Sequence, residues 1–307
     1  MQRNLIDYLI IFFKGLAMGA ADAVPGVSGG TIAFISGIYE ELIATISNIN
    51  ISLFKTLTKK GFKAFWLQVN GNFILALLSG IVFSFITFMK LAKYFLEHHP
   101  ILIWSFFFGL IIASIYFVGK QITKWNAPVV VALILGSTIA YYISTFNSLA
   151  SNDSSIFLFF AGSIAICAMI LPGISGSFIL IILGAYKLLS NAIHNFDIKN
   201  LIIFTTGALV GLLSFSHLLK WLFKHYKNIT LAVLTGFIFG SLNKVWPWKK
   251  TLTWHTNSQG IKSPMLQKSV LPFNFDGNHQ ITMAIALMLI GFLTIFILEK
   301  IGSKKQC

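Results

Sequence analysis

The sequence has few charged residues. Asp, Glu, Lys and Arg make up 10% of its 307 residues, whereas hydrophobic residues make up 56%. Soluble proteins carry about 25% charged residues, and the mean hydropathy of this chain is +0.80. The composition therefore excludes a soluble globular domain and indicates an integral membrane protein.

Acidic residues are scarcer still. The chain has 9 Asp and Glu residues against 23 Lys and Arg residues, which gives a formal net charge of +14. Most lysines flank apolar runs, as the positive-inside rule describes for membrane proteins. We therefore interpret the positive charge as a topological signal and as a contact with anionic membrane lipids. We expect no nucleic-acid partner.

Cysteines and metal-ligand patterns are also sparse. Cys167 lies inside an apolar run and Cys307 is the last residue, so no disulfide framework is predicted. No cluster of Asp, Glu and His has metal-ligand spacing, and we expect neither a metal nor a cofactor. The first apolar run contains Lys14 and leads into a glycine-rich break, which argues against a cleavable signal peptide.

Long apolar runs, by contrast, are abundant. A helix needs about 20 mostly apolar residues to span a membrane. Six runs are close to this length or exceed it: Phe73–Leu96, Pro100–Gly119, Ala127–Ser144, Leu201–Phe223, Ile229–Trp246 and Ile281–Leu298. We predict an all-α integral membrane protein that forms a single polytopic domain over residues 1–307.

Two further apolar regions are broken in the middle. The first runs from Leu5 to Tyr39 and is interrupted by VPGVSGG; the second runs from Ile156 to Leu189 and is interrupted by PGISG. The arms beside each break are short, which favours re-entrant segments over full spans. The breaks also repeat one phrase, with identical pairs that include Pro25 and Pro172, Gly26 and Gly173, Ser28 and Ser175, and Gly29 and Gly176. We predict two repeats, at about 1–148 and 156–307.

Lysine placement predicts the orientation of these repeats. Arg3 precedes the first hairpin and Lys55 follows it, so both of its flanks are predicted to be cytoplasmic. Three spans then place the lysine-free loop Asn147–Ser155 outside, and three more follow the second hairpin. Because three spans are an odd number, the second repeat starts on the opposite side of the membrane from the first. We therefore predict two inverted-topology repeats, each a re-entrant helical hairpin plus three transmembrane helices, with both termini cytoplasmic. One segment fits poorly, since the outer loop Asn243–Gln280 carries five lysines.

The paired breaks predict a binding site. Inverted-repeat transporters bind substrate at the midplane, between discontinuous helices. Helix N-termini, glycine backbone and hydroxyl groups together suit a small anion, most often phosphate. The alternative is that the breaks are sharp turns whose hydroxyl groups cap their own helices. The candidate substrate-binding residues are Pro25, Gly26, Ser28, Gly29, Gly30, Thr31, Pro172, Gly173, Ser175, Gly176 and Ser177.

Charged residues beside the breaks are further candidates. Asp22 precedes the first break and Lys14 lies eight residues earlier. Ionisable residues inside a membrane are costly and are functional candidates by default, so Asp22 could exchange a coupled proton and Lys14 could face the anion. The alternative is that they neutralise each other or cap the break. In SLNKVWPWKK, Lys244, Lys249 and Lys250 are either interfacial anchors or cations for a lipid headgroup.

Three segments together resemble a known family. AADAVPGVSGGTIAFISGIYEELI, MILPGISGSFILIILGAY and GSLNKVWPW are similar to bacterial polyprenyl-phosphate transporters, first catalogued as a domain of unknown function. The resemblance spans essentially the whole chain. It implies flipping of undecaprenyl phosphate across the bacterial cytoplasmic membrane, so that this lipid carrier of cell-wall synthesis is recycled. Ser177 stands where the first copy has Gly30.

Two other function classes remain open from the sequence. Membrane polyprenyl-diphosphate phosphatases also use inverted repeats and a Pro-Gly-x-Ser phrase, but their phrase continues with an arginine. Here Arg3 is the only arginine, so no guanidinium at the breaks can clamp a phosphoryl group, and we expect a transporter and no enzyme. A transporter of a small water-soluble anion is the second alternative. The sequence also leaves open whether the protein forms a homodimer.

Overall fold

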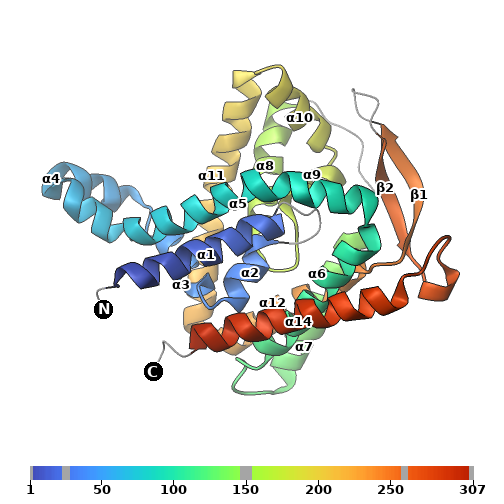
Figure 1. Ribbon diagram of the computed structural model, residues 1–307. Helices are drawn as coiled ribbons and strands as arrows, with labels where there is room; N and C mark the ends of the chain where they lie inside the picture. The colour runs from blue at the N-terminus through green and yellow to red at the C-terminus, as the bar shows by residue number, and fades with distance from the viewer. Residues whose placement is uncertain (1–2, 23–27, 146–153, 257–261, 304–307) are drawn as a thin grey trace.

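The computed structural model describes residues 3–22, 28–145, 154–256 and 262–303 (Figure 1). Helices dominate it. The first half contains α1 (Leu5–Asp22), α2 (Gly29–Ile35), α3 (Tyr39–Ser47), α4 (Ile51–Gln68), α5 (Gly71–His98), α6 (Pro100–Gly119) and α7 (Ala127–Thr145). The second half contains α8 (Ser155–Ile170), α9 (Gly176–Ile182), α10 (Tyr186–His194), α11 (Ile198–His225), α12 (Lys227–Gly240), α13 (Leu242–Val245), strands β1 (Lys249–Thr256) and β2 (Lys262–Ser269), the 3-10 helix η1 (Pro272–Asn274) and α14 (Ile281–Ser303).

Helices cover all six predicted spans. Four segments of the described chain are long and apolar enough to cross a membrane: α6, α7, α11 and the continuous run Lys227–Val245. A fifth span is formed if the pair Lys55–Gln68 and Gly71–Ser84, which is bent by 53° at its break, is taken as one segment. The apolar part of α14, Ile281–Phe296, is shorter. The all-α membrane character is thus confirmed, with four or five such segments where the sequence predicted six.

The two broken regions fold in the same pattern. In each, a long helix ends at the break, a seven-residue helix follows, and a glycine turn leads into a nine-residue helix. The turn glycines Gly37 and Gly184 have φ angles of 74° and 75°, a conformation that glycine adopts without steric cost. Helix α2 contacts α1, and α9 contacts α8. The predicted helix breaks are therefore confirmed in both copies.

Glycines bring the long helices into close contact. The most extensive packing joins α1 with α5, α8 with α11, α6 with α14 and α7 with α12. In each pair, a Cβ atom added to a glycine would overlap a backbone carbonyl oxygen of the partner helix. Small residues let membrane helices approach closely, often with G-x3-G spacing. This spacing occurs at Gly15 and Gly19 of α1, Gly207 and Gly211 of α11, and Gly236 and Gly240 of α12.

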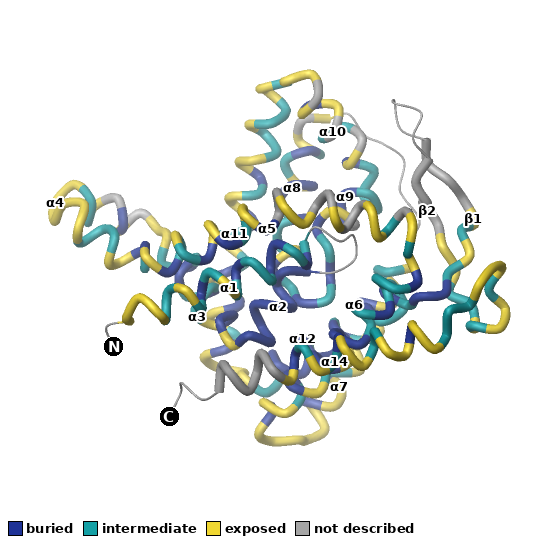
Figure 2. The backbone as a smooth tube through the Cα atoms, in the orientation of Figure 1, coloured by how far each residue is buried: buried dark blue, intermediate teal, exposed yellow. Residues whose placement is uncertain are grey.

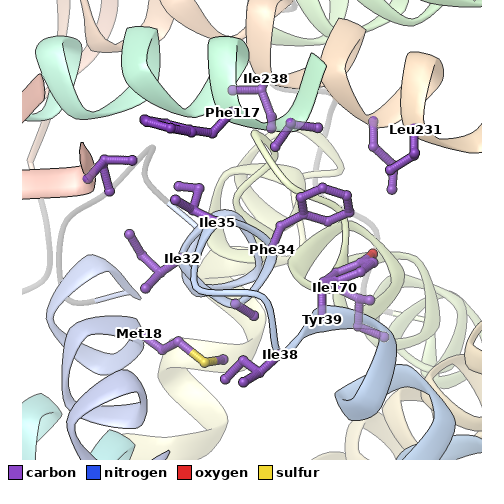
Figure 3. Packing of buried hydrophobic residues seen from close by; sticks show 14 of the residues in the cluster. Met18, Ile32, Phe34, Ile35, Ile38, Tyr39, Phe117, Ile170, Leu231 and Ile238 are labelled. Atoms are coloured by element: carbon purple, nitrogen blue, oxygen red, sulfur yellow. The ribbon is translucent and has the colours of Figure 1, made fainter. Parts of the chain in front are cut away.

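The core surrounds the short helix α2. All seven of its residues are buried, and Figure 2 shows buried backbone concentrated around it. Figure 3 shows Ile32, Phe34 and Ile35 among side chains from several other helices, including Phe117 of α6 and Ile238 of α12. Large apolar side chains on the outer faces of α5, α7, α11 and α14 are exposed, as expected for helices that face lipid.

The long loop before α14 contains a β-hairpin that the sequence analysis did not predict. Strands β1 and β2 pair antiparallel with Lys249 opposite Ser269, and a bulge interrupts the ladder near Thr253. Two tryptophans hold the ends of the loop together. The Trp246 indole N–H donates to the Val270 carbonyl at 2.8 Å, and the Trp248 indole N–H donates to the His279 carbonyl at 2.9 Å. Trp248 is buried against Ile101 of α6 and Ala284 of α14, so it fastens the loop to the helices.

The glycine contacts predict a stability difference between two alanine variants. A Cβ atom at Gly80 would lie 2.1 Å from the Phe12 carbonyl oxygen of α1, whereas one at Gly119 would lie 3.8 Å from Thr235 Cγ2. We expect Gly80→Ala to be less stable than Gly119→Ala by about 1–3 kcal/mol, the usual cost of overpacking. Unfolding of the purified variants in detergent measures this difference. Equal stability would contradict the packing of α1 on α5.

Candidate functional site

The two breaks lie against each other. The Gly173 N–H of the second break donates to Thr31 Oγ1 at 2.9 Å. The Ser28 hydroxyl lies 3.2 Å from the Met169 carbonyl oxygen and 3.4 Å from that of Leu171, both at the end of α8. Ser28 and Thr31 are buried. Segments separated by more than 140 residues are thus joined directly, and we call this contact the seam.

The first break is capped by its own residues. Ser28 is the N-cap of α2 and accepts from the Gly30 N–H at 3.1 Å. The Asp22 carboxylate accepts from the Gly29 N–H at 2.6 Å. A carboxylate at this place is favourable because the helix N-terminus carries partial positive charge. The N–H groups predicted to face an anion are occupied here by the chain itself.

Lys14 and Asp22 do not contact each other. Lys14 Nζ donates to the Ser36 carbonyl at 2.6 Å, and Ser36 is the C-cap of α2. A cation is favourable at this end of a helix. The two charged residues therefore hold opposite ends of α2, which corresponds to the capping alternative.

Glycine is required where the backbones meet. A Cβ atom at Gly30 would lie 2.6 Å from the Ile170 carbonyl oxygen. Gly173 has φ +85°, and a Cβ atom there would lie 2.7 Å from the Phe237 carbonyl oxygen of α12. Gly30 thus allows close packing on the end of α8, and Gly173 allows close packing on α12. Pro25 and Gly26 lie outside the described residues.

The second break is more open than the first. Ser175 is the N-cap of α9, but its hydroxyl pairs with that of Ser177 at 2.9 Å and makes no capping hydrogen bond. Ser177 is exposed, whereas its counterpart Gly30 is buried. Gly176 is buried and lies close to the Ala165 carbonyl of α8. The matched residues of the two repeats therefore have different surroundings.

A pocket lies beside the second break. It is lined by Ala140, Ile143, Ser144, Gly173, Ile174, Ser175, Ser241 and Lys244. A second pocket shares Ser144 and Lys244 with it and adds Asn243, Lys249, Gln267 and Ser269. Two predicted substrate-binding residues and two of the predicted headgroup lysines thus line neighbouring pockets. Ser144, Ser241 and Asn243 were not predicted from the sequence, because single polar residues at helix ends carry no distinctive signal.

Metal ligands and arginine are absent from this region. Within the described residues, no group of three or more His, Cys, Asp or Glu side chains could hold a metal ion. Arg3 Nη1 and Nη2 donate to the Glu41 carboxylate at 2.6 and 2.7 Å, so the guanidinium is engaged in an ion pair away from the seam.

Comparisons with known proteins identify the family. A family model described as undecaprenyl phosphate translocase-like matches residues 18–263. The chain is 46% identical over 308 residues to a polyprenyl-phosphate transporter of Vibrio cholerae, covering 99% of this chain and 100% of that protein. It is 34% identical over 256 residues to a polyprenyl-phosphate transporter of Staphylococcus aureus, covering 78% and 86%. No solved structure matches. The chain belongs to the undecaprenyl phosphate translocase-like family.

Proposed function

We propose that this protein translocates undecaprenyl phosphate across the bacterial cytoplasmic membrane and thereby recycles the lipid carrier of cell-wall synthesis. Its family and the names of two relatives support this substrate class. The observation that carries the mechanism is the seam, where buried hydroxyl and N–H groups of two broken segments meet among apolar helices. Such groups suit a phosphate headgroup at membrane depth.

We propose further that the two halves are inverted repeats with re-entrant hairpins. Helix packing supports this, because exchanging the halves converts the α1–α5 pair into α8–α11 and the α6–α14 pair into α12–α7. An exchange of this kind is the symmetry of alternating-access transporters. In this arrangement both termini are cytoplasmic and the β-hairpin lies outside.

The headgroup is proposed to compete with internal partners for the same groups. Asp22 holds the Gly29 N–H and Thr31 holds the Gly173 N–H, so the seam is closed in this conformation. A phosphate monoester carries the acceptor oxygens that both N–H groups need. We propose that Asp22 leaves Gly29 when the headgroup binds and then takes the proton that is coupled to transport.

Transport without hydrolysis is supported by the engagement of Arg3 with Glu41. A bidentate guanidinium clamp on the reacting phosphoryl group would have to come from Arg3, the only arginine, and this side chain is engaged by Glu41.

Replacing Thr31 tests the seam. Thr31→Val keeps the side-chain shape but leaves the Gly173 N–H without its acceptor, at a cost of about 1–3 kcal/mol for a buried donor. Because the empty seam then closes less readily after the headgroup leaves, we expect flipping of a fluorescent short-chain polyprenyl phosphate in liposomes to fall about tenfold. Thr31→Ser retains the hydroxyl and is the matched control, with a rate close to wild type. Wild-type flipping by Thr31→Val would remove the seam from the mechanism.

Replacing Asp22 tests proton coupling. Asp22→Asn keeps an oxygen that can accept from the Gly29 N–H but cannot exchange a proton at neutral pH. We expect its flipping rate to vary less with pH between about pH 5 and pH 9 than that of wild type, because Asp22 is the proposed coupling site, whereas the phosphate monoester, with a second pKa of about 6, still titrates. A pH profile unchanged by the substitution would exclude Asp22 as the coupling group.

A further inference from the structure

Two neighbouring pockets lie where α13 leads into the β-hairpin. Ser144 at the end of α7, Asn243 and Lys244 of α13, and Lys249 and Ser269 of the hairpin line the outer one. The inner one reaches Gly173 and Ser175 of the second break. Together the two pockets lie between the hairpin and the second break.

Lys249 is the central group of this space. Its Nζ donates to the Lys244 carbonyl at 2.5 Å and lies 3.7 Å from the centre of the Trp104 ring. Neither partner carries a negative charge, although both favour a cation. Burial and the nearby charge of Lys244 hold the pKa of Lys249 well below its usual value. An anion in the pocket would relieve this cost, since buried charges are stable when they are paired.

The adjacent Lys250 behaves differently. Successive strand residues point to opposite faces, and Lys250 is exposed and pairs with Asp276 at 2.7 Å. Lys250 is thus a suitable control, because it is a lysine of the same hairpin that does not line the pocket.

The amide of Asn243 offers a donor to an anion. The Ser269 hydroxyl donates to Asn243 Oδ1 at 2.8 Å, which occupies the acceptor of this amide and leaves its NH₂ group as a donor. The Ser144 hydroxyl donates to the Tyr141 carbonyl at 2.7 Å, and the described residues that line the outer pocket include no Asp or Glu. A pocket with two lysines, an amide donor and no carboxylate among its described lining residues favours a multiply charged anion over a cation or a neutral sugar.

We propose that this pocket is a separate binding site for a phosphate monoester, in which Lys249 and Lys244 contact the phosphate oxygens and from which the headgroup passes by Ser175 to the seam. The proposal rests on the proposed function and adds the place where the lipid headgroup is captured on the face that carries the β-hairpin. The chemistry recognised is the phosphate monoester itself, whether it is free or attached to a lipid chain.

Binding measurements on purified full-length protein in detergent test this site. The probe is a short-chain prenyl phosphate, with inorganic phosphate and the matching prenyl alcohol as competitors. We expect Lys249→Met to weaken prenyl phosphate binding about tenfold or more, because a charge-assisted contact is lost. Lys250→Met is the matched control and should bind within about twofold of wild type, since Lys250 lies outside the pocket. Lys244→Met is the second variant should Lys249→Met fail to fold.

The outcomes separate this site from the function. The proposed binding site would be overturned if both Lys249→Met and Lys244→Met bound prenyl phosphate with wild-type affinity, or if Lys250→Met lost as much affinity as they do. If flipping stayed at the wild-type rate in these cases, the proposed function would still stand. Absence of both binding and flipping in the wild-type protein would overturn both proposals. Competition by prenyl alcohol as strong as by prenyl phosphate would also overturn phosphate recognition. Displacement by inorganic phosphate would support a site for free phosphate, and its failure would support a site for the lipid-borne group.

Discussion

A buried hydrogen bond between the two halves of the chain determines much of this structure. A helix that breaks inside a membrane exposes backbone groups that lipid cannot satisfy. Here the break at Gly173 is satisfied by Thr31, and Ser28 reaches the carbonyls at the end of α8. Each break therefore depends on the other, and the contact lies beside the fully buried helix α2.

The two breaks are alike in sequence and unlike in environment. The first is closed by Asp22, Ser28 and Lys14, whereas the second places Ser175 in a pocket that continues toward Lys244 and Lys249. If the halves exchange these environments, the first break opens while the second closes. This is the geometric requirement of the alternating access that we propose, and it assigns Asp22 the role of an internal anion that holds the first break closed.

Several features could be predicted from the sequence because they depend on local pattern. The Pro-Gly breaks, the turn glycines and the long apolar runs follow from chain chemistry within a few residues, and the structure has helices and breaks at those places. The family followed from three motifs. The G-x3-G spacings in α1, α11 and α12 were also present in the sequence and would have indicated close helix contacts.

Other features depend on contacts that a single sequence does not encode visibly. Lys14 and Asp22 are close enough in sequence to suggest a pair, yet each is held by a different end of α2, because the helix offers both with opposite partial charges. The pocket beside Ser175 combines α7, α13 and the β-hairpin, which are far apart in the chain. The hairpin itself was missed because its strands are mostly polar and the alternation in β1 is short.

Flipping of a fluorescent short-chain polyprenyl phosphate by the wild-type protein in liposomes, with the diphosphate in parallel, tests the central claim most directly. We predict that the monophosphate crosses the bilayer and that no inorganic phosphate is released from the diphosphate. Release of phosphate would show that the paired breaks catalyse hydrolysis, and failure to move the monophosphate would contradict translocation.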